Sequence, residues 1–573
     1  MNINNLLART IDDPAWIRSV FTMKNMYIVI LISLLNGILV LFASQRYMLA
    51  LQQFGYDGKK YYKWLYNKEN NQLSRLTLLC LMCFLFFCVW SLSFTMFFKN
   101  TTDENLKALP AYFGFLVYLL FMFAYIKTER AVRRKMPIKG TKRIVRLGTA
   151  HVLLTMIATL LVCLAVNGIS YLIRNEIVYV LRYGFISFIP VLAPFILLLA
   201  NVIMKPFEKL NEKRYVRRAK AKLEKCDLIK IGITGSYGKT SVKSILSVIL
   251  SEKYRVLATP KSYNTPLGIS IATKRLDSTH DVFIAEMGAK KKGDITDLAV
   301  LVNPDIAVLT GINEQHLETF KDIDTVKATK FELFEHLKKD GKAYFSCDNE
   351  YSAQLYEEFE GEKTLAGLNG EKHPKVYAKN IVATKDGSFF TLVLGEKEID
   401  CQTTLLGVHN VSNIVLASSV AYDLGLPPYM IASGINKISA TTHRLSILPN
   451  NKGIVIIDDS YNSNFDGLKK AIEVVKSFDG RKIIVTPGIV ELGDKQAEIN
   501  EEAGRLIAKA FDKIIVIGKT NAEALIRGLM EEGKTGDDVT FEKNSDRGNN
   551  TLNKIIEKGD VVLFENDLPD TYI

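Results

Sequence analysis

Five long apolar stretches dominate the first 205 residues of this chain of 573. A stretch of about 18 apolar residues is long enough to cross the hydrocarbon core of a bilayer as a helix. Because every backbone polar group in lipid needs an internal partner, such segments are restricted to helical structure. We therefore predict a transmembrane region of about five helices in residues 1–205, at Met26–Ser44, Leu76–Phe98, Ala111–Ile126, Leu147–Ile173 and Val178–Met204.

The loop charges predict how these spans are oriented. Lys and Arg gather between the first and second spans and between the third and fourth, whereas the alternate loops are short and hold few. Positively charged loops stay in the cytoplasm. We therefore expect a multi-pass membrane protein, with its N-terminus outside and everything after the fifth span in the cytoplasm. Much of the net charge of +12 is explained in this way, and we expect no nucleic-acid partner.

The pattern changes after a basic connector at residues 206–226. From Asp227 onward, short apolar runs alternate with helical stretches, which is typical of open α/β sheets. Residues Ile381–Cys401 are richer in short alternating strands and predict a small antiparallel flap.

A phosphate-binding loop follows the connector. Gly232–Ser241 reads Gly-Ile-Thr-Gly-Ser-Tyr-Gly-Lys-Thr-Ser, between a predicted strand at Ile229–Thr234 and a predicted helix at Ser241–Leu250. In this context backbone N–H groups cradle phosphates, the lysine neutralises the β- and γ-phosphates, and the following hydroxyl faces Mg²⁺. Ile233 stands where the common motif has glycine. The predicted nucleotide contacts are Gly235, Ser236, Gly238, Lys239, Thr240 and Ser241.

Four further residues stand at positions where α/β sheets place ligand contacts. Asn264 lies in a turn, Glu286 and His316 each follow a predicted strand, and Lys330 lies on a predicted helix. The carboxyl ends of parallel strands are the usual ligand edge of such a sheet. Taken singly, each has an ordinary alternative: a solvated carboxylate, a helix cap or a surface lysine.

Taken together, in this order, these segments resemble the Mur ligases, ATP-dependent enzymes that add amino acids or dipeptides to peptidoglycan precursors. The resemblance covers about residues 227–565 and extends through four further motifs. It is strongest to the MurF type, which adds D-alanyl-D-alanine. It implies a central ATP-binding domain at 227–440 and a Rossmann-like C-terminal domain at 441–573. The further motifs are Leu406–Asn413, Thr442–Leu445, Asp458–Asn464 and Val490–Gly493.

The resemblance also implies roles for single residues. Lys239, Glu286, His316 and Lys330 would be catalytic. Thr240 and Glu286 would bind one Mg²⁺ and His316 a second, while Lys330 matches a lysine that carries a carbamate in several Mur ligases. Asn264 would lie near the γ-phosphate. The remaining ATP contacts would be Asn410 and Asn413 near adenine, Arg444 on a phosphate and Asp459 on the ribose.

The function implied is a membrane-anchored, ATP-dependent ligase that forms an amide bond on a cell-envelope precursor through an acyl phosphate. The partners would be a lipid-linked or UDP-linked precursor and an amino acid or dipeptide. The chain departs from the family in three places. Membrane spans replace the usual UDP-binding domain, Leu563–Asp570 replaces the family's usual basic, Ser-rich close, and Phe465 stands where the MurF type usually has proline. The alternatives are a poly-γ-glutamate-type ligase, an ATPase-driven envelope transporter and a catalytically silent scaffold.

Overall fold

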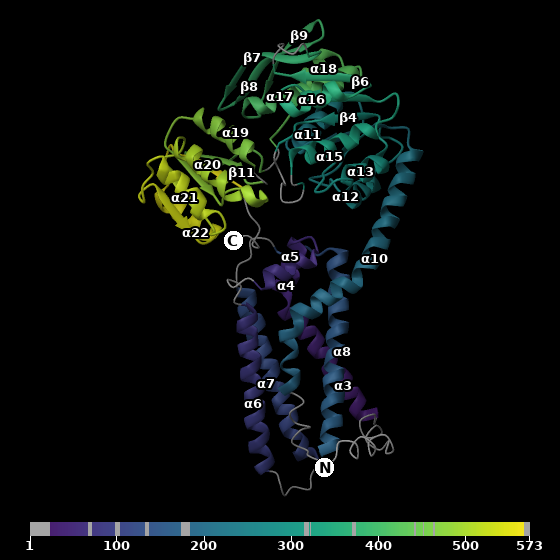
Figure 1. Cartoon of the computed structure of the whole chain (residues 1–573), viewed down its shortest axis with the longest axis vertical. Coiled ribbons are helices and arrows are strands. Elements are labelled where there is room, and N and C mark those ends of the chain that lie inside the picture. The colour runs from purple at the N-terminus through teal and green to yellow at the C-terminus, as the bar shows by residue number, and fades with distance from the viewer. Residues whose placement is uncertain are drawn as a thin grey trace. The chain divides into compact units, whose positions relative to one another are not determined.

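A computed structural model describes most of the chain in two compact units, which meet between Leu210 and Asn211 (Figure 1). The first unit is helical and the second contains both sheets. The described residues are 23–66, 72–97, 104–131, 137–173, 184–313, 320, 322–368, 374–440, 443–450, 452–461 and 464–566.

The helical unit consists of long apolar helices with two short ones between them. The boundary with the second unit falls inside its last helix, so the predicted connector continues that helix rather than forming a separate segment. The elements are α3 (Met23–Ala43), α4 (Gln45–Gln53), α5 (Gly58–Leu65), α6 (Gln72–Phe97), α7 (Glu104–Ala131), α8 (Lys142–Ile173) and α10 (Ile189–Lys225).

Two of the described helical segments are long and apolar enough to cross a membrane, at Lys142–Val166 and Ile189–Lys225. A third would be formed by Val29–Ala43 with Gln45–Gln53, which are bent by 54° at the break between them. The apolar helices Leu76–Trp90 and Phe113–Lys127 are shorter. The prediction of five spans is therefore supported for two or three of them, and the full count remains a prediction.

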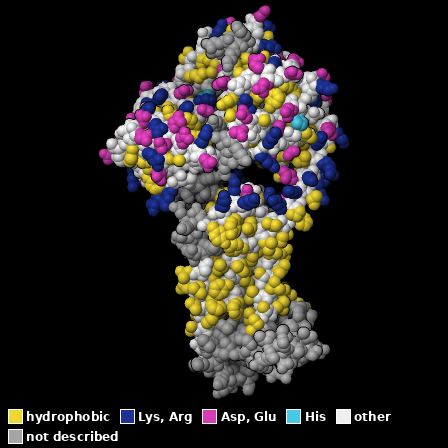
Figure 2. All heavy atoms as spheres, viewed as in Figure 1, with side chains coloured by type: hydrophobic (Ala, Val, Ile, Leu, Met, Phe, Trp, Pro, Cys, Tyr) yellow, Lys and Arg dark blue, Asp and Glu magenta, His cyan; other side chains and the backbone are white. Residues whose placement is uncertain are grey.

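The surface of the helical unit is apolar. Large hydrophobic side chains are exposed along α3, α6, α7 and α8, among them Leu31, Leu78, Leu120, Phe123 and Leu161. Figure 2 shows this surface as a nearly continuous hydrophobic face, whereas charged side chains of both signs are interspersed over the α/β unit. Exposed apolar area on this scale is typical of a surface that contacts lipid or another protein.

A row of polar side chains lies inside this apolar unit, and we refer to Asn36, Ser44, Tyr118, His151 and Thr159 as the polar seam. Asn36 Nδ2 donates to Thr159 Oγ1 at 2.9 Å, and the Tyr118 hydroxyl donates to Asn36 Oδ1 at 2.6 Å. Ser44 Oγ lies 3.1 Å from His151 Nε2. All five side chains are buried. The seam joins α3, α7 and α8 through hydrogen bonds.

The central domain is built on a nine-stranded sheet of order β2-β3-β1-β4-β5-β6-β7-β8-β9. Strands β2 to β7 are parallel, and β7, β8 and β9 are antiparallel neighbours. The predicted flap is therefore an antiparallel extension of the main sheet. The strands are β1 (Ile229–Thr234), β2 (Val256–Ala258), β3 (Val282–Glu286), β4 (Ile306–Leu309), β5 (Lys342–Ser346), β6 (Glu362–Gly367), β7 (Val376–Thr384), β8 (Gly387–Leu394) and β9 (Lys397–Thr403).

Helices cover both faces of this sheet because its parallel strands are apolar on both sides. Ile231 and Ile233 of β1 pack into one hydrophobic cluster with α11, α17 and α18, while Phe283 and Ala285 of β3 pack into another with α13 and α15. The helices are α11 (Lys239–Leu250), α12 (Pro266–Ala272), α13 (Asp294–Val302), α15 (Ile323–Glu335), α16 (Glu350–Glu358), α17 (Val408–Asp423) and α18 (Pro428–Asn436).

The C-terminal domain has a six-stranded sheet of order β10-β11-β15-β12-β13-β14, parallel except at β10. Its strands are β10 (Ser446–Leu448), β11 (Val455–Asp459), β12 (Lys482–Thr486), β13 (Lys513–Ile517), β14 (Val539–Glu542) and β15 (Val561–Glu565), and its helices are α19 (Phe465–Lys476), α20 (Gln496–Ala508), α21 (Ala522–Glu531) and α22 (Ser545–Ile555). Both sheets confirm the predicted α/β class.

Candidate active site

The phosphate loop connects β1 to α11, as the sequence predicts. Gly235 has a φ of 148° and Gly238 a φ of 76°. A Cβ atom at Gly235 would lie 2.1 Å from Thr310 Oγ1, so this position accepts no side chain. Gly232 has a different role: a Cβ there would lie 2.9 Å from a methyl carbon of Leu333. The unusual glycine spacing therefore reflects the close approach of β1 to α15.

Lys239 begins α11 and folds back over the loop. Its Nζ donates to the carbonyl oxygens of Gly235 at 2.6 Å and Ser236 at 2.8 Å. Burial lowers the pKa of Lys239 to about 8, with Glu286 opposing the shift and Arg444 adding to it. A partly buried ammonium group beside the open N–H groups of a helix N-terminus favours an anion.

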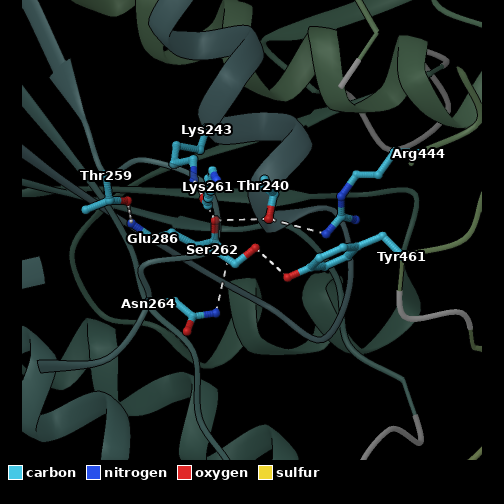
Figure 3. Close-up of polar contacts among 9 residues, drawn as sticks. All are labelled: Thr240, Lys243, Thr259, Lys261, Ser262, Asn264, Glu286, Arg444 and Tyr461. Carbon is cyan, nitrogen blue, oxygen red and sulfur yellow. Dashed lines mark hydrogen bonds and ion pairs between the residues drawn. The ribbon is translucent and has the colours of Figure 1, made fainter. Parts of the chain in front are cut away.

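Glu286, at the end of β3, is the centre of a buried hydrogen-bond network (Figure 3). Its Oε2 accepts from Thr240 Oγ1 at 3.0 Å and from Lys243 Nζ at 2.9 Å. Its Oε1 accepts from Asn264 Nδ2 at 3.2 Å. Its backbone N–H donates to Thr259 Oγ1 at 3.1 Å. Each carboxylate oxygen is thus held in a fixed direction.

Lys243 is the cation that compensates this carboxylate. The side chains of Lys243 and Glu286 are only 4% and 2% exposed, and Lys243 Nζ also donates to the carbonyl oxygen of Lys261. A charge buried to this degree is tolerated when it is paired and hydrogen-bonded.

Thr240 and Glu286 fit a magnesium ion. Both present hard oxygen ligands, and Mg²⁺ usually binds through one or two carboxylates together with water and substrate phosphates. His316, the third predicted ligand, lies outside the described residues. Within the part of the chain that the structure describes, no cluster of three or more His, Cys, Asp or Glu side chains could hold a metal ion. The protein oxygens would therefore form a partial shell that phosphates and water complete.

Two adjoining cavities surround the phosphate loop. The loop cavity, of about 430 Å³, is lined by the loop itself and by Asn264, Glu286, Lys330, Arg444 and Glu491. The α17 cavity, of about 330 Å³, is lined by residues that include Ser241, His409, Asn410, Asn413, Asp459 and Lys470. Both are lined by Tyr237, Gly238, Arg444, Tyr461 and Asn464. Apart from His316, every predicted site residue therefore lines one or both cavities.

Lys330, on α15, is buried in the wall of the loop cavity. Burial lowers its pKa to about 7, the charge of Lys239 adds to the shift, and the carboxylates of Asp294 and Glu332 oppose it. Near neutral pH a substantial fraction of this side chain is therefore the neutral amine, which has an available lone pair.

In the α17 cavity, Asn410 Nδ2 donates to the carbonyl oxygen of Leu406 at 2.8 Å. Asp459 accepts the backbone N–H of Leu445 at 3.1 Å. Burial raises the pKa of Asp459 to about 6, against the effects of that N–H group and of Arg444.

The two sheets of the second unit both contribute to the site. Arg444 Nη2 donates to Thr240 Oγ1 at 3.4 Å, and its guanidinium carbon lies 4.8 Å from the centre of the Tyr461 ring. The Tyr461 hydroxyl donates to Ser262 Oγ at 2.6 Å. Figure 3 shows Arg444 and Tyr461 side by side, opposite Thr240 and Ser262. The C-terminal domain thus supplies a cation and a ring to the phosphate loop.

Several side chains that line the two cavities or pair with Glu286 were not identified as site residues from the sequence: Tyr237, Lys243, Tyr461, Lys470 and Glu491. Lys243 offered one usable signal, since it follows Lys239 by one helical turn on a face that otherwise becomes buried. Lys470 lies 4.3 Å from the centre of the Tyr237 ring, a contact that the sequence gives no means of predicting.

We predict that Lys243→Met lowers the free energy of unfolding by about 3–5 kcal/mol, because it leaves the buried Glu286 carboxylate without its cation. Adding Glu286→Gln should restore much of this loss. Urea unfolding followed by far-UV circular dichroism measures both. The matched control is Lys342→Met in the exposed Lys342–Glu362 pair, which should cost less than about 1 kcal/mol. Equal losses at Lys243 and Lys342 would contradict the prediction.

Comparisons with known proteins identify the family to which both domains belong. Two protein-family models match the chain: the Mur ligase middle domain over residues 233–421, and the Mur ligase, glutamate ligase domain over residues 443–565. Together they cover more than half of the 573 residues.

Two curated relatives are both named UDP-N-acetylmuramoyl-tripeptide–D-alanyl-D-alanine ligase. The protein of Buchnera aphidicola subsp. Baizongia pistaciae is 31% identical over 297 residues, which are 52% of this chain and 64% of that protein. The protein of Bacillus subtilis is 28% identical over 355 residues, 61% of this chain and 75% of that protein. The chain thus spans about two thirds to three quarters of the length of these relatives.

A solved structure shares the fold. The MurF ligase of Thermotoga maritima, in complex with ADP, has a TM-score of 0.54 and 23% sequence identity, covering 62% of this chain and 80% of that chain.

Proposed function

This chain belongs to the Mur ligase family, and from that membership and the site geometry we propose that it is a membrane-anchored, ATP-dependent ligase of the MurF type. It would join a carboxyl group of a peptidoglycan or other cell-envelope precursor to the amino group of an amino acid or dipeptide, and release ADP and phosphate. The names of the relatives supply the first substrates to test: UDP-N-acetylmuramoyl-tripeptide and D-alanyl-D-alanine.

The observation that carries this proposal is the composition of the loop cavity. Lys239 and Thr240 of the phosphate loop, the Glu286 carboxylate and the buried Lys330 amine line one space, together with Arg444 from the other domain. That space adjoins the α17 cavity. The α17 cavity would hold the nucleoside of ATP, and the loop cavity its terminal phosphate and the acceptor carboxylate. The ADP in the Thermotoga maritima structure supports a nucleotide in this fold.

The chemistry proceeds in two steps. An acceptor carboxylate oxygen attacks the γ-phosphorus of ATP, the new O–P bond forms, and the bond to the bridging oxygen breaks as ADP leaves. The neutral amine then attacks the acyl carbon of the acyl phosphate, phosphate leaves with the electrons of the C–O bond, and the nitrogen releases a proton to phosphate or water. Phosphoryl transfer is catalysed mainly by positioning and charge neutralisation, which Lys239 and Arg444 would provide.

Thr240 and Glu286 would hold a magnesium ion, which supplies charge neutralisation for the phosphates. Lys243 and Asn264 fix the direction of the Glu286 oxygens. A second ion bound through His316 remains part of the proposal.

Lys330 would carry a carbamate. Its amine is buried, and its pKa of about 7 leaves a large neutral fraction at physiological pH. A neutral amine attacks carbon dioxide, forms an N–C bond and releases a proton, so that an anion replaces a cation. An anion at this place in the loop cavity would relieve the repulsion between Lys330 and Lys239.

The helical unit would anchor the enzyme in the bacterial cytoplasmic membrane. Its candidate spans, its exposed apolar side chains and the exposed Lys59, Lys60 and Lys63 of α5 support this proposal. A ligase held at the bilayer could use a lipid-linked precursor as readily as a UDP-linked one.

The ligase proposal predicts that the full-length protein forms one ADP, one phosphate and one amide per turnover, and only when both acceptor and amine are present. Lys239→Ala should slow the reaction by at least about 100-fold, because it removes a charge that stabilises the transferring phosphoryl group. Coupled ADP release and mass spectrometry of the product measure this. The control is the exposed Lys385→Ala, which should retain activity.

Two results would contradict the MurF-type assignment. Turnover with glutamate chains but not with muropeptides would indicate a poly-γ-glutamate-type ligase. Full ATP hydrolysis without any amine would favour an envelope transporter.

Carbamylation of Lys330 predicts a dependence on bicarbonate and pH. Because the pKa of Lys330 is lowered to about 7, the reactive neutral amine predominates above pH 7 and is lost as the pH falls below it. Activity in carbon-dioxide-free buffer should recover on addition of bicarbonate, more completely at pH 8 than at pH 6. Lys330→Arg should be inactive at both, while Lys327→Arg on the same helix should behave as wild type. Activity of Lys330→Arg would refute the carbamate.

The membrane proposal predicts the side on which reporters are active. Alkaline phosphatase inserted after Asn100 should be active, since that loop is expected outside. The same reporter after Lys68 or at the C-terminus should be inactive, and a fluorescent protein at the C-terminus should fluoresce. Phosphatase activity at the C-terminus would place the C-terminus outside and overturn the predicted orientation.

A further inference from the structure

One end of the helical unit carries exposed lysines from two segments that are far apart in the sequence. Three of them lie on α5, and two lie at or just before the start of α8. Figure 2 shows dark blue side chains at the end of this unit where Figure 1 places α4 and α5. We refer to these residues as the lysine cluster, which consists of Lys59, Lys60, Lys63, Lys139 and Lys142.

Helix α5 is held so that its lysines face outward. Tyr61 and Leu65 are buried in the hydrophobic core of the helical unit. The Tyr61 hydroxyl also donates to the carbonyl oxygen of Pro194 on α10 at 3.3 Å. Lys59 and Lys63 are about one helical turn apart, so both lie on the face of α5 opposite Tyr61. The two ammonium groups therefore project from the same side of a fixed helix.

The start of α8 is fixed beside the turn that precedes α5. The Gln52 amide donates to the carbonyl oxygen of Lys139 at 2.9 Å, and the Lys139 N–H group donates back to Gln52 Oε1 at 2.9 Å. The guanidinium carbon of Arg143 lies 3.7 Å from the centre of the Tyr56 ring. Asn201 on α10 donates to the carbonyl oxygen of Tyr56 at 3.1 Å. The two lysine-bearing segments therefore belong to one connected surface.

The carboxylates near the lysine cluster are few. Asp57 is the only Asp or Glu in residues 23–66 and 137–173 of the sequence. Its side chain accepts two backbone N–H groups of α5 at 2.8 and 3.3 Å, so it caps that helix. Glu208 on α10 is held by Arg146 in a bidentate pair with two N···O distances of 2.7 Å. The surface around α5 is therefore positively charged and favours a ligand with several negative charges.

The lysine cluster also borders the exposed apolar surface of the helical unit. Val145, which follows Lys142 on α8, is 63% exposed. Tyr62 and Tyr66 of α5 are exposed as well, with their ring centres 4.7 Å apart. Tyrosines gather at the level of the lipid headgroups in membrane proteins. A ligand that fits both features has an apolar chain and an anionic headgroup.

We propose that the lysine cluster binds a lipid with a diphosphate headgroup, and that this lipid carries the acceptor of the ligase. The inference rests on the proposed function and names its acceptor class. A phosphodiester lipid brings one negative charge, which a single lysine neutralises. A diphosphate brings two adjacent anionic groups, which match Lys59 and Lys63 on one face of α5. Such contacts are charge-assisted hydrogen bonds.

The test measures the binding of radiolabelled farnesyl diphosphate to the full-length protein in phosphatidylcholine nanodiscs. Lys59→Gln combined with Lys63→Gln should raise the Kd by about 30-fold, since each lysine near a membrane surface contributes about fivefold. Lys59→Arg combined with Lys63→Arg keeps both charges and should stay within about threefold of wild type.

The matched control removes the same charge elsewhere. Lys213→Gln combined with Arg217→Gln changes two exposed positions further along α10, and should leave the Kd unchanged. An equal rise of the Kd in the control and in the Lys59 and Lys63 variant would indicate attraction to the overall charge of the protein, and would overturn the proposal.

Competitors identify the ligand class. Farnesyl monophosphate should compete about 10-fold more weakly than the diphosphate, because it brings less charge to the lysines. Inorganic pyrophosphate, which has no apolar chain, should compete weakly, as should phosphatidylglycerol added to the nanodiscs. Competition by phosphatidylglycerol equal to that of farnesyl diphosphate would make the ligand an ordinary anionic lipid surface and overturn the proposal. Equal competition by inorganic pyrophosphate would make it a soluble phosphate compound and overturn it as well.

A ligase assay distinguishes this inference from the function on which it rests. With a muropeptide linked to a polyprenyl diphosphate as acceptor, the Lys59→Gln and Lys63→Gln variant should show a KM for the acceptor raised by about 30-fold and an unchanged KM for ATP. If wild type forms an amide on the UDP-linked muropeptide but not on the lipid-linked one, the inference alone fails. If wild type binds farnesyl diphosphate through the lysines but forms no amide on either acceptor, the ligase function fails and the lipid site remains.

Discussion

The buried carboxylate of Glu286 is the point on which the rest of the site depends. It ends the strand next to β1, so its position is set by the sheet, and its two oxygens are held by Thr240, Lys243 and Asn264. These partners come from α11 and from the turn before α12. One carboxylate thereby links the phosphate loop, α11 and the turn that holds Asn264. Its burial is tolerated because Lys243 neutralises its charge.

The candidate active site is also formed by two domains, because loops from both sheets line the same cavity. Lys239, Glu286 and Lys330 come from the central domain, while Arg444, Tyr461 and Glu491 come from the C-terminal domain. Under the proposed function, the phosphate end of the nucleotide and both further substrates would be enclosed only by the two domains together. Contacts such as Tyr461 to Ser262 and Asn313 to Asp466 hold the two halves in register.

The parts of this protein that could be predicted from the sequence are those encoded locally. The phosphate loop is a contiguous motif with an obligatory strand and helix on either side, so its bounds and its lysine were found without a structure. Glu286 was found because strand ends carry ligands in α/β sheets. Lys243 and Tyr461 were missed as site residues because their roles arise from partners far away in sequence, Glu286 and Ser262.

The membrane part shows a different limit. Hydropathy detects length and apolarity, and it located the helices, but it does not show where a helix bends or continues. A hydropathy profile shows neither the 54° bend between Ala43 and Gln45 nor the continuation of α10 from Ile189 to Lys225. The loop Pro487–Leu492 was equally hidden from sequence analysis. Its carbonyl oxygens accept from Asn500, Asn521 and Asn566, which are far apart in sequence and meet only in the folded domain.

The polar seam of the helical unit has a consequence for how that unit assembles. Anchoring a protein in a membrane requires only one apolar helix, which would be free to rotate about its long axis. In lipid no water competes for the amide of Asn36, so its bonds to Tyr118 and Thr159 hold α3, α7 and α8 at set rotations. If the helices span a bilayer as proposed, these hydrogen bonds decide which residues of α3, α7 and α8 face the lipid and which face one another.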